Sequence, residues 1–216
     1  MSIIWIAGWP HNGSTLLREI LQQCWGVVSH SLYAEPELEF LFGAQAAEFG
    51  QDWGRDPVTK RFYYEQAPEV HFIKTHELPV DGNPALFVVR DGRDAMTALS
   101  RFWKLPIRNL IVGQNCAFGG WSNFIWGWDP WGRPNTLLLR FEKMVRDPMA
   151  VAGQVREWLD LPIPRAFTDR YVENQKVHPA LYNGRVDIWK DGMRPVDQDL
   201  FWKCHGAMME RLGYAK

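Results

Sequence analysis

The beginning of the chain constrains the fold more than any other stretch. A short apolar run of strand type, Ile3–Ala7, is followed from residue 16 to residue 21 by leucine and isoleucine at helical spacing. The turn between them carries residues that tight turns favour, Gly8, Pro10, Asn12 and Gly13. Strand, glycine turn and helix in this order hold anions, because backbone N–H groups of the turn and the positive helix end point at the charge. The stretch predicts a phosphate-type site, with an ordinary strand–turn–helix as the alternative.

The spacing of this turn differs from that of loops that hydrolyse nucleotides. Gly8 and Gly13 enclose four residues and are followed by Ser14 and Thr15, whereas a nucleoside-triphosphate loop reads G-x-x-x-x-G-K-[ST]. Ser14 stands where that loop has the lysine that reaches the β- and γ-phosphates. The turn therefore argues against ATP or GTP hydrolysis and favours an anion shorter than a triphosphate.

The totals of the sequence narrow the classes of partner. A formal net charge of −1 over 216 residues gives no global basic field for nucleic acid or a membrane surface. No apolar run approaches a membrane span, and the first strand is too short and lacks a basic lead for a signal peptide. Three scattered cysteines, Cys24, Cys116 and Cys204, lack metal spacing. We expect buried, reduced thiols in a cytoplasmic protein without a metal site.

Strand patterns alternate with helical patterns along the whole chain. Further strands are expected at residues 70–76, 84–89 and 136–141, and helices at residues 14–24, up to about 103 after the turn at 90–94, at 147–159 and at 197–212. Residues 85–89 are almost continuously apolar, as in a strand that is covered on both faces. The alternation predicts one α/β domain over residues 1–216, with three α/β/α layers and a central parallel sheet.

Three segments carry weaker patterns. Residues 29–66 include a helical start at 34–42 and no chemical signature, and we expect a cap on the substrate side. Residues 102–134 are rich in Trp, Gly, Asn and Pro, which predicts an irregular lid or one broken helix around 120–128. Residues 179–195 are expected to form a loop. Tryptophans in the middle of the chain can line a pocket for apolar groups, although a structural role is favoured for most of them: Trp103, Trp121, Trp126, Trp128 and Trp131.

Five stretches resemble, in family order, the sulfotransferases that use 3′-phosphoadenylyl sulfate (PAPS). Residues 9–15, W-P-H-N-G-S-T, resemble the phosphosulfate loop Y-P-K-S-G-T-T, and residues 73–79, I-K-T-H-E-L-P, resemble L-K-T-H-L-P. Residues 89–94 resemble the R-N-P-[KR]-D segment, residues 139–148 the F-Y-E-D-M-x-x-D-P stretch, and residues 183–191 the late R-K-G-x-x-G-D-W-K-N loop. The resemblance extends from residue 3 to about residue 191 and implies the P-loop NTPase-like sulfotransferase fold.

The resemblance also implies an activity and its catalytic residues. A sulfonyl group would pass from PAPS to a hydroxyl or amine of a small-molecule acceptor by in-line displacement, with 3′-phosphoadenosine 5′-phosphate (PAP) as the product. His76 matches the general base, a role that suits an imidazole at a strand end. Lys74, two residues earlier on the same face, is expected to hold the sulfonyl oxygens. His11 replaces the Lys or Arg that stabilises the leaving oxygen in the family, so weakened or lost transfer is the alternative.

Cofactor contacts carry over from the resemblance residue by residue. The 5′-phosphosulfate falls on the loop residues Pro10, His11, Asn12, Gly13, Ser14 and Thr15. Arg90 matches the arginine that binds the 3′-phosphate, for which its fork of donors is suited. The partner serine of the family falls on Ala98, and its Arg-Lys-Gly falls on Tyr182, Asn183 and Gly184, with Arg185 able to supply the missing charge. The family tryptophan that stacks on adenine is Leu16 here, and the tyrosine of F-Y-E-D is Phe141.

Two other functions stay open at this stage. A small-molecule or nucleotide kinase uses the same layout, although Ser14 disfavours it. A catalytically decayed module would bind PAP without transferring a sulfonyl group, as the changes at residues 11, 98 and 182–183 allow. The acceptor and the oligomeric state do not follow from the sequence.

Overall fold

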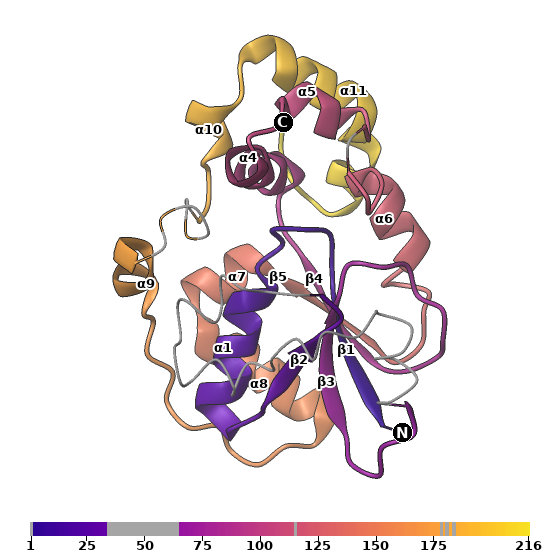
Figure 1. The fold of residues 1–216 in the computed structure, drawn as a ribbon, viewed down its shortest axis with the longest axis vertical. Helices are drawn as coiled ribbons and strands as arrows, with labels where there is room; N and C mark the ends of the chain where they lie inside the picture. Colours follow the sequence, from indigo (N-terminus) through magenta and orange to yellow (C-terminus); the bar gives the residue numbers. More distant parts are fainter. Residues whose placement is uncertain (1, 34–64, 115, 178, 180–181, 183–184) are drawn as a thin grey trace.

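The computed structural model describes residues 2–33, 65–114, 116–177, 179, 182 and 185–216. At its centre lies a five-stranded sheet in which neighbouring strands are parallel, in the order β2-β3-β1-β4-β5 (Figure 1). The strands are β1 (Ile3–Ala7), β2 (Ser29–Ser31), β3 (His71–Thr75), β4 (Ala85–Val89) and β5 (Thr136–Arg140). In β1, Ala7 lies opposite Thr75 of β3 and Phe87 of β4. The C-terminal ends of these three strands therefore lie close together.

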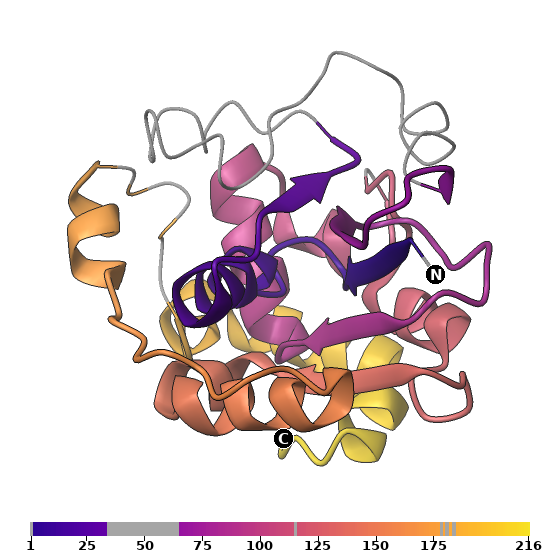
Figure 2. The ribbon, with the colours of Figure 1, turned by 90° about the horizontal axis from the view of Figure 1, so that it is seen from below.

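The two faces of the sheet carry separate apolar cores, because successive side chains of a strand point to opposite sides. On β1, Ile3 and Trp5 join one core, and Ile4 and Ile6 join the other. The first core also receives side chains from α4 (Gly92–Trp103), α5 (Ile107–Ile111), α6 (Trp121–Trp128) and α11 (Pro195–Arg211). The second receives them from α1 (Ser14–Trp25), α7 (Phe141–Arg146) and α8 (Pro148–Leu159). The expected three-layer α/β/α fold with a parallel sheet is confirmed (Figure 2).

Local sequence explains where the best-predicted helices begin and end. α1 starts after Gly13 and ends at Gly26, and both glycines have positive φ, 98° and 73°. α8 starts with Pro148 behind Asp147, whose carboxylate accepts a hydrogen bond of 2.9 Å from the N–H of Ala150. α8 therefore begins with a side-chain cap, whereas the N-cap of α1 is Gly13, which has no side chain to cap the helix.

In the described part of residues 104–134, α6 lies where we expected a helix around 120–128, and a further helix, α5, precedes it. Gly113 and Gly119, with φ of 75° and 73°, lie between them and allow the chain to reverse. The expected loop at 179–195 contains a short helix, α10 (Trp189–Gly192). Neither β2 nor α9 (Tyr171–Val177) was expected, because neither segment has an apolar period. Of the expected cap over residues 29–66, residues 29–31 form β2, and residues 34–64 lie outside the described residues.

The tryptophans and cysteines differ in burial more than we expected. Trp121 and Trp128 are core residues, each 1% exposed, whereas Trp126 and Trp131 lie on the surface. The three cysteines are free. The expectation that they are buried is correct for Cys24 but wrong for Cys116, which is partly exposed, and for Cys204, which is exposed on α11. Within the described ranges, no helix is both long and apolar enough to cross a membrane.

Candidate active site

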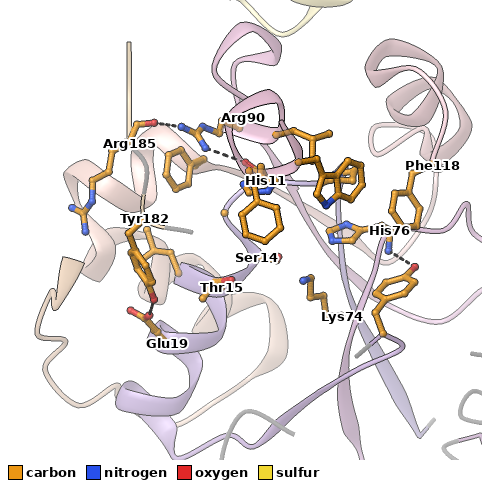
Figure 3. Close-up of a pocket in the computed structure, with 18 of the residues that line it drawn as sticks. His11, Ser14, Thr15, Glu19, Lys74, His76, Arg90, Phe118, Tyr182 and Arg185 are labelled. Carbon is orange, nitrogen blue, oxygen red and sulfur yellow. Dashed lines mark hydrogen bonds between the residues drawn. The ribbon is translucent and has the colours of Figure 1, made fainter. Parts of the chain in front are cut away.

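A pocket of about 370 Å³ opens at the end of the sheet where β1, β3 and β4 stop. Figure 3 shows His76 at one end and Glu19 with Tyr182 at the other, and Ser14 and Thr15 lie between them. Its polar lining residues are His11, Ser14, Thr15, Glu19, Lys74, His76, Arg90, Tyr182 and Arg185; the remainder are Pro10, Gly13, Leu16, Tyr33, Leu99, Phe102, Trp103, Phe118, Phe141 and Tyr171. Open α/β sheets bind ligands at this end of their strands, which makes the pocket the candidate active site.

The loop after β1 is held in shape by Asn12. Its side-chain nitrogen donates to the carbonyl of Val88 at 3.1 Å, and its side-chain oxygen accepts from the N–H of Ser14 at 3.0 Å. Asn12 is 1% exposed and does not line the pocket, so it positions the loop from behind. Position 13 has no room for a side chain, because a Cβ there would lie 2.1 Å from the ring of Phe141. The loop thus leads into α1, whose first N–H groups have no acceptor within the helix.

His76 is held in one orientation at the end of β3. Its Nδ1 lies 2.6 Å from the carbonyl oxygen of Gly8, and its ring stacks on Tyr33 with centroids 5.5 Å apart. The Tyr33 hydroxyl accepts from the His76 backbone N–H at 2.9 Å, and the Phe118 ring lies edge-on to the imidazole. A carbonyl oxygen can only accept, so Nδ1 carries the proton. In the neutral ring, Nε2 therefore holds the lone pair that a general base needs.

His11 lies on the loop between three other cationic or titratable side chains. Burial, followed by the charges of Arg90, Lys74 and His76, lowers the pKa of His11 to about 3. The ring is therefore neutral near pH 7 and can donate one hydrogen bond to a ligand. It packs against Phe102 with centroids 5.0 Å apart. At the position where the resemblance implied a permanent cation, the side chain is therefore an uncharged donor.

Arg90 is 4% exposed and joins the loop after β1 to the chain near residue 185. Its guanidinium donates to the carbonyl of His11 at 3.1 Å and to the carbonyl of Arg185, and it lies 4.5 Å from the centre of the Phe141 ring. The Arg185 guanidinium lies over the Tyr171 ring at 4.0 Å and forms a two-pronged pair with Asp169. Both arginines line the pocket, but each already has protein partners.

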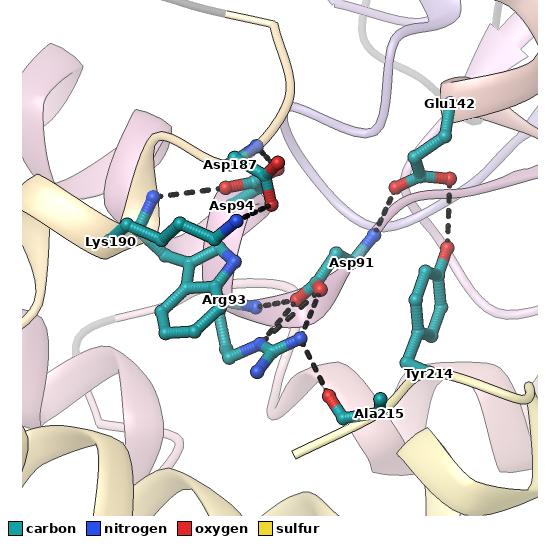
Figure 4. A network of polar contacts seen from close by, with 9 residues as sticks. Asp91, Arg93, Asp94, Glu142, Asp187, Lys190, Tyr214 and Ala215 are labelled. Atoms are coloured by element: carbon teal, nitrogen blue, oxygen red, sulfur yellow. Dashed lines mark hydrogen bonds and ion pairs between the residues drawn. The ribbon is translucent and has the colours of Figure 1, made fainter.

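A polar network behind the pocket fixes the chain that follows Arg185 (Figure 4). The carboxylate of Asp94 accepts from the backbone N–H groups of Asp187 at 2.8 Å and Trp189 at 3.0 Å. Arg93 pairs with Asp91 at 2.7 Å and lies over the Trp189 ring at 3.9 Å. Burial raises the pKa of Asp94 to about 6, against the lowering effect of Arg90 and of the two N–H donors. α4 therefore anchors the segment that brings Arg185 to the pocket.

The structure brings most of the candidate residues together. The lining includes Pro10, His11, Gly13, Ser14, Thr15, Lys74, His76, Arg90, Tyr182 and Arg185. Two of the described candidates do not line the pocket: the Asn12 side chain is buried beneath the loop, and Ala98 is buried in α4. Asn183 and Gly184 lie outside the described residues. Among the described residues, no group of three His, Cys, Asp or Glu side chains could hold a metal ion.

Sequence reasoning missed several residues of the pocket, among them Leu99 and Phe102 at the end of α4. Glu19 lies one helical turn after Leu16, so helical spacing on the face of a predicted site residue was an available signal. Tyr33, Phe118 and Tyr171 come from segments without a clear pattern, and no signal in the sequence pointed to them.

Comparisons with known proteins identify the fold. No protein-family profile matches the chain. Luciferin sulfotransferase of Photinus pyralis is 25% identical over 118 residues, a match that covers 45% of this chain and 32% of that protein. Mouse sulfotransferase SULT7A1, solved with PAP, has a TM-score of 0.66 at 15% identity and covers 96% of this chain and 84% of its own.

Two further solved structures have the same fold. Retinol dehydratase, solved with retinol and PAP, has a TM-score of 0.66 at 13% identity and covers 100% of this chain and 83% of its own. The sulfotransferase domain of the Synechococcus PCC 7002 olefin synthase has a TM-score of 0.55 at 18% identity, with coverage of 99% and 95%. The sulfotransferase fold that the sequence predicted is therefore confirmed.

Proposed function

We propose that this protein is an enzyme that transfers a sulfonyl group from PAPS to a hydroxyl or amine of a small-molecule acceptor. The observation that carries this assignment is the meeting of His76, Lys74, His11 and Arg90 in one pocket beside the start of α1. The fold, which is shared with a sulfotransferase and a retinol dehydratase that were both solved with PAP, supports the same assignment. Ser14 in place of a Walker lysine disfavours a kinase.

The chain's own groups can serve each part of an in-line displacement. The Nε2 of His76 accepts the proton of the acceptor hydroxyl as its oxygen bonds to sulfur. The bond from sulfur to the bridging oxygen breaks, and that oxygen leaves on the 5′-phosphate of PAP. Lys74 neutralises charge on the sulfonyl oxygens, while His11 donates a hydrogen bond toward the bridging oxygen. As in phosphoryl transfer, positioning and charge stabilisation provide most of the rate.

The two ends of the pocket suit different parts of the reactants. Tyr33 and Phe118 surround His76, and together with Phe102 and Trp103 they favour a partly apolar acceptor. Retinol dehydratase, in the same fold, was solved with retinol. Arg90 and Arg185 supply positive charge for the 3′-phosphate at the other side of the loop. The three free cysteines agree with action in the reducing cytoplasm. We take residues 1–216 as one domain.

Calorimetric titration with PAP tests the cofactor. AMP is the matched ligand, because it differs from PAP only in lacking the 3′-phosphate. We expect PAP to bind at least tenfold more tightly, as a charge-assisted contact contributes about 1.5–3 kcal/mol. Transfer of radioactive sulfonate from PAPS to a panel of phenols, alcohols and amines then tests the reaction. Equal binding of PAP and AMP, or magnesium-dependent transfer from ATP, would overturn the assignment.

A second function is favoured by the surroundings of His11, because burial and the neighbouring cations lower its pKa to about 3. Without a cation at this position, the protein can be a module that binds PAP and transfers nothing. The titration and the transfer assay separate the two functions. Tight binding of PAP, with neither transfer to any acceptor class nor hydrolysis of PAPS, identifies the module.

A further inference from the structure

A buried polar cluster closes the end of the pocket that lies away from His76 (Figure 3). The Tyr182 hydroxyl donates to Oε1 of Glu19 at 2.8 Å. The side-chain nitrogen of Asn174 donates to the same Tyr182 hydroxyl at 3.1 Å and to Oε1 of Glu19 at 3.4 Å. Glu19 is 6% exposed and still lines the pocket. The proposed transfer gives this carboxyl group no role.

The proposed function leaves one part of the cofactor for this end. Ser14 and Thr15 are assigned to the 5′-phosphate, and Arg90 and Arg185 to the 3′-phosphate. The acceptor occupies the end at His76, so the base of the nucleotide has to lie on the opposite side of the loop. Glu19 is on the same side of α1 as Thr15 and Leu16, because residues three and four apart share a helix face.

The chemistry of Glu19 suits one kind of base. Its Oε1 already accepts from Tyr182, and its second oxygen can accept another hydrogen bond. A 6-aminopurine presents an exocyclic amino donor next to the ring nitrogen N1, which is an acceptor. We propose that the Glu19 carboxyl accepts a hydrogen bond from the 6-amino group and thereby selects adenine as the base of the nucleotide. This inference rests on the proposed function, since it requires a nucleotide bisphosphate in the pocket.

The protonation of Glu19 is compatible with this contact. Burial raises the pKa of Glu19 to about 7, with a further increase from Asp169 and opposing effects of the Tyr182 hydrogen bond and of Arg185 and Arg170. The ionised carboxylate accepts from the amino group. The neutral acid accepts in the same way and can also donate from its hydroxyl to N1, so both forms recognise the same edge of the base.

The test compares two ligands on several variants. The ligands are PAP and its analogue with unsubstituted purine, which keeps both phosphates and lacks the 6-amino group. In calorimetric titrations of the wild type, we expect PAP to bind about tenfold more tightly than the analogue. Glu19→Ala should reduce this preference to less than twofold, whereas Glu19→Gln should keep most of it, because the amide oxygen also accepts. Glu173→Ala, which removes an exposed carboxylate from α9, is the matched control and should keep the full preference.

The outcomes distinguish a failure of the Glu19–adenine contact from a failure of the proposed function. Absence of PAP binding to the wild type overturns the proposed function itself. Equal binding of both ligands to the wild type, or a tenfold preference that survives Glu19→Ala, overturns the role of Glu19 and leaves the sulfotransferase assignment intact. Thermal unfolding of each variant establishes that it is folded. If Glu19→Ala is not, Glu19→Leu, which fills the space but has no acceptor, takes its place and should also reduce the preference to less than twofold.

Discussion

His76 Nδ1 lies 2.6 Å from the carbonyl oxygen of Gly8, which joins the end of β3 to the first residue after β1. The contact needs glycine at position 8, since a Cβ there would lie 1.7 Å from the side-chain nitrogen of Asn12 and 2.4 Å from the carbonyl of Val88. The same Asn12 holds the loop that leads into α1. The orientation of the candidate base and the shape of the candidate phosphate loop are therefore set by one group of contacts.

The first prediction concerns His76 as the base. His76→Ala should lower kcat for sulfonyl transfer by at least about 100-fold, the lower end for loss of a general base. The affinity for PAP should change by less than about threefold, because Nε2 acts on the acceptor. Rates from radioactive PAPS and calorimetry with PAP measure the two effects. In the control Tyr33→Phe, the imidazole and its bond to Gly8 remain, so kcat should stay within about tenfold of wild type. Transfer by His76→Ala at near wild-type rate would mean that another group takes the proton.

The second prediction concerns the charge on His11. Its pKa of about 3 is set by burial and by the positive charges of Arg90 and Lys74. PAP would bring an anionic phosphate beside the ring, and an opposite charge favours the protonated imidazole. In NMR titrations, His11 should stay neutral from pH 8 to pH 5 in the free protein and show a higher pKa in the PAP complex. The signal is assigned by its loss in His11→Phe. Titration near pH 6.5 in the free protein would contradict the buried, cation-surrounded environment.

The sequence was informative where local chemistry decides the structure. The apolar run Ile3–Ala7, the glycine turn and the start of α1 are set by neighbours in the chain, and all three were predicted correctly. Lys74 and His76 were expected to share a face of β3, and both line the pocket. These residues lie at strand ends, whose position follows from the parallel topology alone.

The remaining parts depend on contacts between distant segments. β2 is the polar tripeptide Ser29–Ser31, and it is a strand because it pairs with β3 at the edge of the sheet. The resemblance placed Tyr182 in the site, but its hydrogen bond to Glu19, 163 residues earlier in the chain, was not expected. Contacts between residues this far apart cannot be predicted from a local stretch of the sequence. Ala98 was assigned from the resemblance by counting from Arg90, and its place inside α4 is set by packing that the count does not contain.

The third prediction concerns the partner of Arg185. Asp169 holds the Arg185 guanidinium, and this pair lowers the pKa of the Asp169 carboxyl. A bound 3′-phosphate has to compete with that carboxylate. Asp169→Asn should therefore tighten PAP binding by about threefold, the scale of a partly exposed ion pair, and AMP binding should not change. The control Asp187→Asn removes an exposed carboxylate that pairs with Lys190 and should leave both affinities unchanged. Weaker PAP binding in Asp169→Asn would instead identify Asp169 as a positioning residue for Arg185.

The fourth prediction separates backbone strain from crowding at Gly13. Gly13 and Gly119 both have positive φ, 98° and 73°, so alanine at either position costs about 1–2 kcal/mol of conformational energy. A Cβ at Gly119 meets nothing within 4 Å, whereas at Gly13 it would lie 2.1 Å from the Phe141 ring. Urea unfolding should show a loss of about 1–2 kcal/mol for Gly119→Ala and a clearly larger loss for Gly13→Ala. Equal losses would show that the Phe141 ring can move aside at no cost.

The fifth prediction uses a buried histidine remote from the pocket. His205 joins α11 to α5 and α6, because its Nε2 donates to the carbonyl of Ile111 at 2.9 Å and its Nδ1 accepts from the Ser122 hydroxyl at 2.7 Å. Burial lowers the pKa of His205 from 6.5 to about 4, partly opposed by the hydrogen bond to Ile111. The neutral ring is thus favoured in the folded state.

The sign of the pH effect follows from that depressed pKa. Above pH 6.5 neither state is protonated at His205 and its contribution to stability is complete. Between pH 6.5 and pH 4 the unfolded chain takes up a proton that the folded protein does not, so the contribution falls by about 2 kcal/mol at pH 5. Glu19 and Asp94, with raised pKa values of about 7 and 6, act in the opposite sense over the same range. The effect of His205 must therefore be measured as a difference between proteins.

His205→Gln provides that difference, since its amide can still donate to Ile111 and does not titrate. In urea unfolding, the variant should be less stable than wild type at pH 7.5, and this deficit should shrink by about 2 kcal/mol at pH 5. Ser122→Ala is the matched control: it removes the hydroxyl but keeps the imidazole, so its deficit should be similar at the two pH values. A deficit of His205→Gln that is the same at both would mean that His205 accepts a proton in the folded protein, with the hydroxyl of Ser122 turning to accept from Nδ1.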